Sequence, residues 1–186
     1  MLARIEASSQ KDVLLGIFFE STLDFMASTL GSERTDQIRA KVLRKVVSFF
    51  RYPVGDLLKL LIGAIPETAN DEEFDAAVTE YGRAAVRFFF TSPVGKTMSI
   101  LAGSDAHRLM DSAPSGYKAV TTFGERVYLR RGEQHAEVTF TGELLGSAWQ
   151  VGVFKEALLQ VSDFEPAIEV RLGNDSGSDF VMSVRW

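Results

Sequence analysis

Residues 127–140 read VYLRRGEQHAEVTF, and they mark the place where the apolar residues of this chain change their spacing. Apolar and polar residues alternate here, with the apolar ones at Val127, Leu129, Val138 and Phe140. A period of two is typical of strands, and the Gly132-Glu133 pair between the two runs suits a turn. The stretch therefore predicts an antiparallel hairpin.

The chain downstream of this hairpin predicts one helix and a second hairpin. Residues 147–161 return to helical spacing. Two alternating runs follow, at residues 168–172 and 180–186, and the segment 173–177 between them has the composition of a turn. The order hairpin, helix, hairpin indicates a four-stranded antiparallel sheet with a helix packed on it.

Upstream of residue 120, apolar residues recur at intervals of three and four, which predicts a bundle of helices. The expected helices cover residues 12–30, 32–50 (from Ser32 or Thr35), 53–63, 70–90 and 93–103, with a short sixth helix from Ser104 or Asp105. Gly31 is the expected stop of the first helix. Asn70, which three acidic residues follow, is the expected N-cap of the fourth.

Together these elements predict a single α+β domain over residues 1–186. The helical part spans about residues 12–117, and the hairpin-helix-hairpin part spans about residues 120–186. We expect the N-terminal helical bundle to pack on the C-terminal four-stranded sheet, because each element has an apolar face to bury. A chain of 186 residues is long enough for one complete core and short for two.

Charge and composition exclude several classes of function. A formal net charge of -5, from 20 basic and 25 acidic residues, argues against nucleic acid as a partner. The chain has no cysteine, and therefore no disulfide, thiolate nucleophile or cysteine-bound metal. It shows no signal peptide and no apolar run long enough to cross a membrane, so we expect a soluble cytoplasmic protein. The basic residues Arg39, Lys41, Arg44, Lys45 and Arg51 are expected to form a solvated face.

Motifs that would indicate an enzyme or a metal site are weak. Residues 95–97, Gly-Lys-Thr, match the end of a phosphate-binding loop, but such a loop requires a glycine where this chain has Phe90. His107 and His135 are the only histidines, and they fall on different expected elements. The serine motif of the hydrolases is missing. We therefore expect no enzyme activity, no metal and no cofactor.

Six short segments resemble, in sequence and in order, an uncharacterised paralogous family best known from myxobacteria. They are GIFF (16–19), FFRYPV (49–54), YGR (81–83), SPVGKT (92–97), LAG (101–103) and FGER (123–126). The matching segments span roughly residues 12–126, and the hairpin-helix-hairpin tail is similar as well.

In architecture, the stretch from Tyr81 to Tyr117 and the elements after it resemble three groups of domains. These are the heme nitric-oxide-binding domains, the four-vinyl-reductase domains and the small subunits of the transport-particle tethering complex. The resemblance implies helices over an antiparallel sheet, an apolar ligand pocket between them, and a homodimer.

The chain departs from each of these groups in the residues of the ligand site. The position of the heme-binding histidine falls near Tyr117, residues 127–131 lack the Tyr-Ser-Arg cluster that holds the propionates, and the acyl-carrying cysteine is missing.

Fourteen phenylalanines, several of them clustered, either fill a core or, as in the resembled fold, line an apolar cavity or a dimer interface. The candidate residues for an apolar ligand pocket are Phe19, Phe50, Phe89, Tyr81 and Tyr117. Arg83 and Glu125 lie within two of the family segments, and they are the candidates for a buried ion pair that fixes a helix to the sheet.

Three hypotheses for function follow. The first is a non-enzymatic binding or signalling module that recognises a small apolar ligand or a partner protein, without heme. The alternative is a structural or scaffold protein that forms a homodimer through its apolar helices. The second alternative is a heme-type gas sensor, which the resemblance suggests and the departures at the site oppose.

Overall fold

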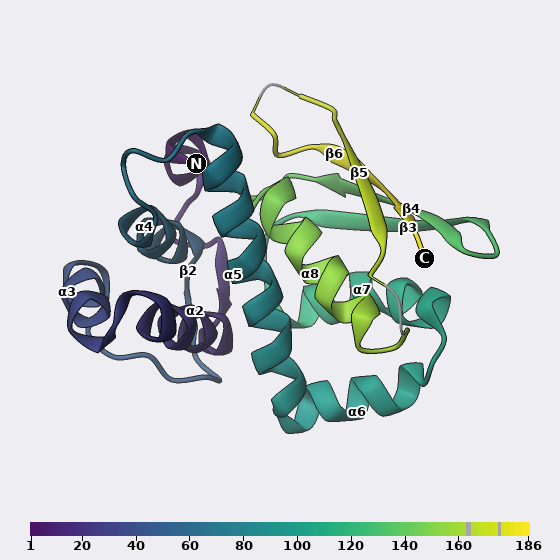
Figure 1. Cartoon of the computed structure of the whole chain (residues 1–186), viewed down its shortest axis with the longest axis horizontal. Helices are drawn as coiled ribbons and strands as arrows, with labels where there is room; N and C mark the ends of the chain where they lie inside the picture. Colours follow the sequence, from purple (N-terminus) through teal and green to yellow (C-terminus); the bar gives the residue numbers. More distant parts are fainter. Residues whose placement is uncertain (163–164, 175) are drawn as a thin grey trace.

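A long helix, α5 (Asp71–Thr91), separates the N-terminal helices from the sheet in the computed structural model (Figure 1). The structure describes residues 1–162, 165–174 and 176–186, without the side chains of residues 94, 98, 99, 101 and 102. The described chain combines helices with a four-stranded antiparallel sheet. The predicted α+β fold class is therefore confirmed.

The N-terminal part contains helices and a short two-stranded sheet. Its elements are α1 (Leu2–Ala7), β1 (Val13–Leu15), α2 (Gly16–Leu30), α3 (Ser32–Val42), β2 (Arg51–Pro53) and α4 (Val54–Ala64). β1 and β2 pair antiparallel, with Leu14 opposite Tyr52. Gly31 ends α2 as predicted, and its φ of 83° lies in the left-handed region that glycine adopts without strain.

The prediction of one helix over residues 32–50 is wrong in its second half. α3 ends at Val42, and the following residues return to the start of α2. There the backbone N–H groups of Gly16 and Ile17 donate to the carbonyl oxygens of Phe50, at 2.7 Å, and Ser48, at 2.9 Å. Because residues 48–53 make these long-range bonds, they are not helical. The same pairing makes residues 13–15 a strand, so the helix expected over residues 12–30 begins only at Gly16.

The start of α5 matches the prediction. The side chain of Asn70 accepts a hydrogen bond from the backbone N–H of Glu73 at 3.0 Å, and the Glu73 carboxylate accepts one from the Asn70 N–H at 3.0 Å. This reciprocal arrangement is a capping box, which satisfies two N–H groups that the first turn of a helix leaves free.

α5 packs closely against α8 (Ser147–Leu159), because each helix carries a glycine at the contact. A Cβ atom at Gly82 would lie 2.3 Å from the carbonyl oxygen of Trp149. A Cβ atom at Gly152 would lie 2.0 Å from the carbonyl oxygen of Thr79. Neither separation is possible between real atoms, so this spacing of the two helices requires both glycines.

Two helices connect α5 to the sheet, α6 (Pro93–Ala102) and α7 (Ala106–Val120). Asp105 caps α7, since its side chain accepts a hydrogen bond from the Arg108 N–H at 3.1 Å. α7 is longer than the short helix expected here, and it continues through Pro114 to Val120.

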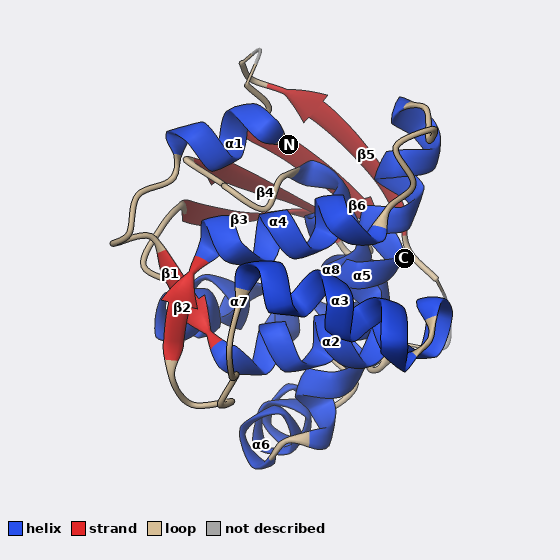
Figure 2. Ribbon diagram, turned by 90° about the vertical axis from the view of Figure 1, so that its left-hand side faces the viewer, coloured by secondary structure: helices blue, strands red, loops and turns tan. Residues whose placement is uncertain are grey.

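The sheet contains β3 (Glu125–Gly132), β4 (His135–Thr141), β5 (Ala167–Leu172) and β6 (Phe180–Arg185), in the spatial order β3-β4-β6-β5. All neighbouring strands are antiparallel, as the two predicted hairpins require. Figure 2 shows the four strands side by side behind the helices.

The apolar core has two parts. One packs α2, α4 and α5 together with Trp149 of α8, and the other packs α7 and α8 against β4 and β6. In the second part the rings of Phe140 and Phe180 stack with centroids 4.4 Å apart. Among the described residues, no helix combines the length and apolar character that a membrane span needs.

Candidate ligand-binding cavity

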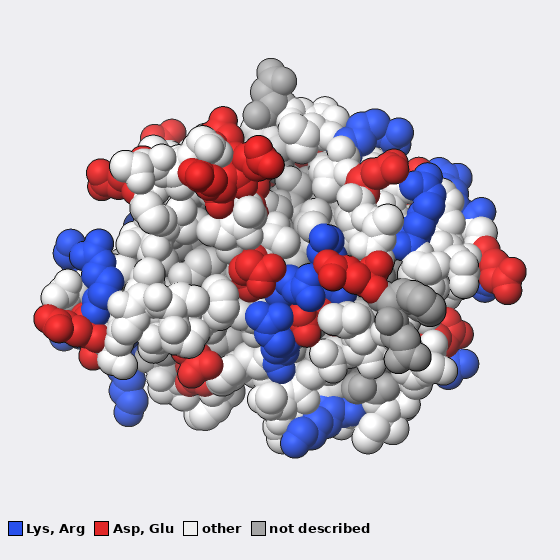
Figure 3. Space-filling view, in the orientation of Figure 1, with Lys and Arg blue, Asp and Glu red and all other residues white. Residues whose placement is uncertain are grey.

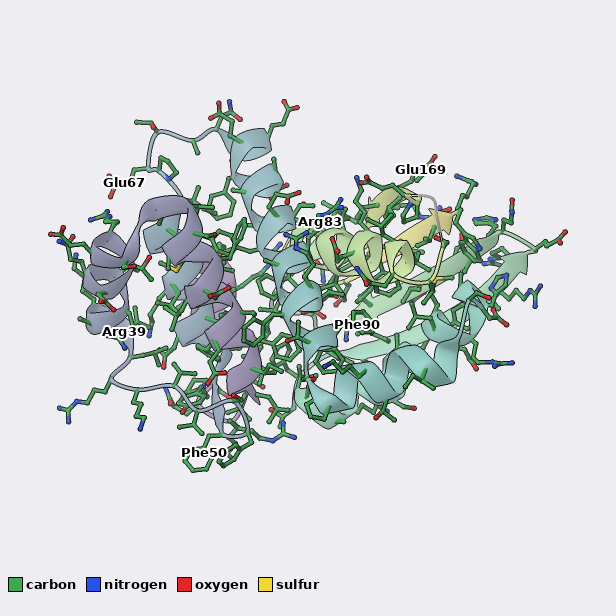
Figure 4. The ribbon with its side chains drawn as sticks, turned by 60° about the horizontal axis from the view of Figure 1, so that its bottom comes forward. Arg39, Phe50, Glu67, Arg83, Phe90 and Glu169 are labelled. Atoms are coloured by element: carbon green, nitrogen blue, oxygen red, sulfur yellow. The ribbon has the colours of Figure 1, made fainter. Side chains whose placement is uncertain are left out.

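A cavity of about 150 Å³ lies where α5, α7 and α8 approach one another beside β3. Its wall includes Phe89 and Phe90 of α5, Met110 of α7, and Val153 and Phe154 of α8. Figure 4 shows Phe90 near the end of α5 that leads into α6. Large apolar side chains from three helices therefore surround one space.

Small residues leave this space open. Ala113 and Gly116 of α7 and Ala157 of α8 line the cavity between the larger side chains. They are three or four residues from other lining positions, so they lie on the same helix faces. Protein interiors are otherwise filled to the density of organic crystals. A void of this size is therefore a specific property of these residues.

Four of the described lining residues are polar, namely Tyr117, Thr121, Arg126 and Gln150. Two of them bind one buried carboxylate, that of Glu143. Nη2 of Arg126 donates to Oε2 of Glu143 at 2.9 Å, and the Tyr117 hydroxyl donates to the same carboxylate at 2.9–3.0 Å. The Leu145 N–H also donates to Oε1 at 2.9 Å. Glu143 thus joins α7, β3 and the loop after β4.

Arg126 is also held by aromatic rings. Its guanidinium lies over the ring of Tyr117, and the Phe140 ring centroid is 4.9 Å away on the sheet. Burial raises the pKa of Tyr117 well above its usual value, and the negative charge of Glu143 is the second largest cause of this shift. Tyr117 therefore remains a neutral phenol that donates a hydrogen bond to Glu143.

Two N–H donors in the wall have no hydrogen-bond partner among the described residues. They are Nε of Arg126 and Nε2 of Gln150. Both atoms are shielded from bulk water, and Gln150 as a whole is 1% exposed. A buried polar group without a partner costs about 1–3 kcal/mol. The cavity is thus apolar over most of its wall, and these two donors are buried beneath its surface.

The structure brings together two of the five residues that the sequence suggested for a pocket. Phe89 and Tyr117 line the cavity, but Phe19, Phe50 and Tyr81 do not. Phe19 is buried in the N-terminal core, and Tyr81 is buried against the ring of Phe25. Phe50 is 56% exposed and points away from the helices on the loop before β2 (Figure 4). These three residues therefore do not belong to this cavity, and their part in binding a ligand stays a prediction.

The expected Arg83–Glu125 ion pair is also wrong. Arg83 of α5 donates from Nε to Glu156 of α8 at 3.2 Å, and from Nη1 to Glu165 at 2.9 Å. Glu125 is exposed at the first position of β3. Arg83 thus fixes one helix to another, and Figure 3 shows acidic and basic side chains gathered over α5 and α8. The buried arginine of the sheet is Arg126, which follows Glu125 in the chain.

Sequence reasoning missed Arg126, Glu143 and Gln150. The register of the hairpin contains the signal for the first, because Arg126 lies opposite Phe140 and Tyr128 lies opposite Val138. Residues directly opposite each other in a hairpin share one face of the sheet. The apolar face of β4 therefore places the arginine on the buried face of β3. No local pattern marks Glu143, which lies in a loop.

Neither histidine of the chain lines the cavity. One ring nitrogen of His107 is hydrogen-bonded to the Tyr128 hydroxyl, and the other lies 2.8 Å from the carbonyl oxygen of Glu133. His135 on β4 is hydrogen-bonded to Ser183 of β6 at 2.9 Å. Both imidazoles therefore have structural partners away from the cavity.

Comparison with solved structures shows which class of fold this is. An H-NOX protein from K. algicida, in its Fe(II) unliganded form, is 14% identical and has a TM-score of 0.75. The match covers 92% of this chain and 96% of that one. An H-NOX protein from S. oneidensis in the Fe(II)NO ligation state is also 14% identical, with a TM-score of 0.69 and coverage of 92% and 97%. The chain has the H-NOX fold, and at these identities the likeness shows the fold alone.

Within that fold the chain belongs to a family described as Protein of unknown function (DUF2378), whose model matches residues 8–186. No curated protein matches the chain. The expected resemblance to an uncharacterised family and to the heme nitric-oxide-binding architecture is thereby confirmed. The likeness to four-vinyl-reductase and transport-particle domains stays a prediction.

The residues of the cavity do not fit the heme that this fold implies. Heme iron in proteins is held by histidine, cysteine, tyrosine, or methionine opposite histidine. The chain has no cysteine, its histidines lie elsewhere, and Tyr117 stays a protonated donor to Glu143. Met110 would lack the histidine with which it is paired in cytochromes. The cavity is also smaller than the roughly 300 Å³ needed for even a drug-sized ligand.

Proposed function

We propose that this protein is a non-enzymatic binding module that holds one small apolar ligand, without heme, in the cavity between α5, α7 and α8. The observation that carries the proposal is the cavity itself, with a volume of about 150 Å³ and an almost wholly apolar wall. An apolar space of about this volume accommodates a molecule of the size of benzene. The ligand is therefore expected to be about one aromatic ring in size.

Energetics support the same interpretation. The pocket is half open, so part of its apolar wall remains in contact with water while the pocket is empty. A ligand that fills it would remove this apolar surface from water and add van der Waals contacts, which favours binding. A ligand that binds only the folded state would also stabilise the protein.

The location of the cavity suggests how occupancy would be signalled. Its wall comes from α5, α7, α8 and β3, so a ligand would touch elements from both parts of the core. A ligand in the cavity would favour one distance between α7 and the helices α5 and α8 and would disfavour other distances. A partner that distinguishes these spacings would then read the bound state. Homodimer formation stays a prediction, which light scattering over a concentration series would test.

The test is to fill the cavity from within. Ala113→Leu and Ala157→Leu would each place a larger side chain in the void, whereas Ala76→Leu changes an exposed position of α5 and serves as the control. Toluene should raise the melting temperature of the wild-type protein and of the control, but not of the two filled variants. An equal effect of toluene on all four proteins, or no effect on any, would contradict the proposal.

A further inference from the structure

The edge strand β5 leaves one side of its backbone unpaired among the described residues. It is the last strand in the order β3-β4-β6-β5, and Figure 2 shows it at the end of the sheet away from β3. Proteins usually block such an edge with a proline, an irregular register or a very short strand. The register of β3 is irregular between Arg130 and Gly132. β5 has six residues, no proline and a regular register with β6, so this edge is open to a further strand.

A hydrogen bond directly after β5 shows which backbone groups of the strand point outward. The N–H of Gly173 donates to the carbonyl oxygen of Asp179 at 2.7 Å, so Gly173 faces the chain of β6. In an antiparallel sheet, the side on which a residue makes its hydrogen bonds alternates from one residue to the next. Ile168, Val170 and Leu172 therefore direct their N–H and C=O groups toward the free edge.

The same part of β5 exposes apolar side chains. Val170 lies opposite Met182 of β6, and Met182 is fully buried in the core. Leu172 lies opposite Phe180, which is buried as well. Residues directly opposite each other share one face of the sheet. Val170 and Leu172 therefore continue the apolar face of the sheet to its edge, where they are 38% and 60% exposed.

The charges of β5 are complementary to those of a second copy of the same strand. Glu169 and Arg171 flank Val170 and lie on the opposite face of the sheet. If two copies pair antiparallel with Val170 opposite the partner's Val170, each Glu169 lies opposite an Arg171. The outward backbone groups of Ile168 then meet those of the partner's Leu172. The two neighbouring registers that keep these backbone groups aligned place Glu169 opposite Glu169, or Arg171 opposite Arg171, and like charges in that position are unfavourable.

We infer that this protein binds a second copy of itself through β5, with Val170 on the two-fold axis, so that the two sheets become one continuous sheet. The interface is the same on both copies, as two-fold symmetry requires. It covers the exposed Val170 and Leu172 and satisfies the free backbone groups. It uses no residue of the cavity and is independent of the proposed function. One pair of strands buries less surface than a standard interface, so we expect a reversible dimer whose share rises with protein concentration.

Reversal of one charge on β5 tests the pairing. Glu169→Arg and Arg171→Glu each place like charges opposite one another twice in the dimer, because the interface is symmetric. The matched controls are Glu67→Arg, between α4 and α5, and Arg34→Glu on α3, which make the same changes of charge at exposed positions. Figure 4 shows Glu67 on the opposite side of the molecule from Glu169.

The single variants are expected to fold. Within its own chain, Glu169 contacts Arg185 of β6 at 3.2 Å, and its side chain is 75% exposed. Such an exposed ion pair contributes little to stability. Circular dichroism and thermal unfolding of each variant verify the fold before association is measured.

Two further samples show whether a lost dimer reflects this particular pairing. In a mixture of the Glu169→Arg and Arg171→Glu proteins, every charge on one strand lies opposite the other sign on its partner. A heterodimer should therefore form although neither variant pairs well with itself. The double variant Glu169→Arg, Arg171→Glu exchanges the two charges and should form a homodimer again.

Sedimentation equilibrium of the full chain at pH 7 and low salt measures the dissociation constant of each sample. The wild-type protein and both controls should agree, each single variant should dimerise about tenfold more weakly or less, and the mixture and the double variant should return close to the wild-type value. A wild-type protein that is monomeric up to millimolar concentration overturns the inference. A dimer that both single variants retain, or one that neither the mixture nor the double variant restores, overturns it as well. None of these results bears on the binding of toluene in the cavity, so the proposed function is tested separately.

Discussion

Arg126 and Glu143 form an ion pair in the interior of the protein, with 2.9 Å between Nη2 and Oε2 and with side chains that are 4% and 1% exposed. The pair ties the first strand of the sheet to the loop after β4, and the Tyr117 hydroxyl adds α7 to the same carboxylate. Glu143 accepts from three separate donors, which a carboxylate away from water requires. Loss of either charge leaves the other buried without compensation.

Glu143→Gln is therefore expected to destabilise the protein by about 3–5 kcal/mol, the usual cost of breaking a buried ion pair by removing one partner. The amide retains the size of the carboxylate, so the loss comes from charge and hydrogen bonding rather than from a cavity. Urea denaturation followed by circular dichroism measures the change. A loss below about 1 kcal/mol would mean that water reaches the pair after all.

The double variant Arg126→Met, Glu143→Leu should be more stable than the sum of the two single changes predicts. Removing both charges leaves neither ion uncompensated, and buried pairs replaced by apolar residues often cost little. A coupling energy of about 1–3 kcal/mol is expected from the complete set of four proteins. Simple additivity of the two single losses would contradict a direct interaction between these side chains.

Gly152→Ala is expected to destabilise the protein by about 2–3 kcal/mol, because the new Cβ would lie 2.0 Å from the Thr79 carbonyl oxygen and would push α5 and α8 apart. Gly132→Ala is the control, since the nearest atom to its Cβ is the Cβ of His135 at 3.6 Å. The control should change the stability by less than about 0.5 kcal/mol. Thermal unfolding of the three proteins compares the two positions, and equal effects would show that the helices can move apart freely.

Local signals explain which parts of the fold could be predicted. Gly31 stops a helix through its own backbone freedom, Asn70 caps one through a residue three positions away, and each hairpin depends on neighbouring runs. The pairing of residues 13–15 with 51–53 has no such signal. It depends on contacts between distant parts of the chain, and because of it two helices are shorter than the sequence predicts.

Composition could suggest an apolar site, but it could not distinguish a cavity wall from a core. Phe89 lines the cavity while Phe19, in an equally apolar cluster, is fully buried in the core. Phe50 was expected on a helix face and lies exposed in a loop instead. Among the polar residues that were missed, Arg126 follows from the sheet register and Glu143 from its position in a loop. These properties appear only when the strands are aligned.

Glu156→Gln is expected to cost about 1.5–3 kcal/mol. Its carboxylate is 4% exposed and accepts hydrogen bonds from Nε of Arg83 at 3.2 Å and Nη1 of Arg87 at 2.8 Å. Glu165→Gln removes another carboxylate partner of Arg83, and Glu165 is 48% exposed. That control should cost less than about 1 kcal/mol, as exposed ion pairs usually do. If the two variants lost equal stability, burial would not explain the strength of the Glu156 contacts.

Tyr81 gives the protein a dependence on alkaline pH whose sign can be stated. Burial raises the pKa of Tyr81 to about 12 in the folded protein, and a hydrogen bond with Thr29 opposes this effect only in part. In the unfolded chain the phenol loses its proton near pH 10. Between these two values the folded state binds more protons than the unfolded state, so stability falls as the pH rises. Below pH 10 both states are protonated and this contribution is constant.

Tyr81→Phe removes this titration without removing the ring that packs against Phe25. The free energy of unfolding would be measured by urea denaturation at pH 8, 10 and 11. It should decline more steeply for the wild-type protein than for the variant, by at most about 1.4 kcal/mol for each pH unit above 10. All other ionisable side chains are the same in both proteins, so the difference between the two curves isolates Tyr81. Parallel curves from pH 8 to pH 11 would mean that the Tyr81 hydroxyl is solvated in the folded state.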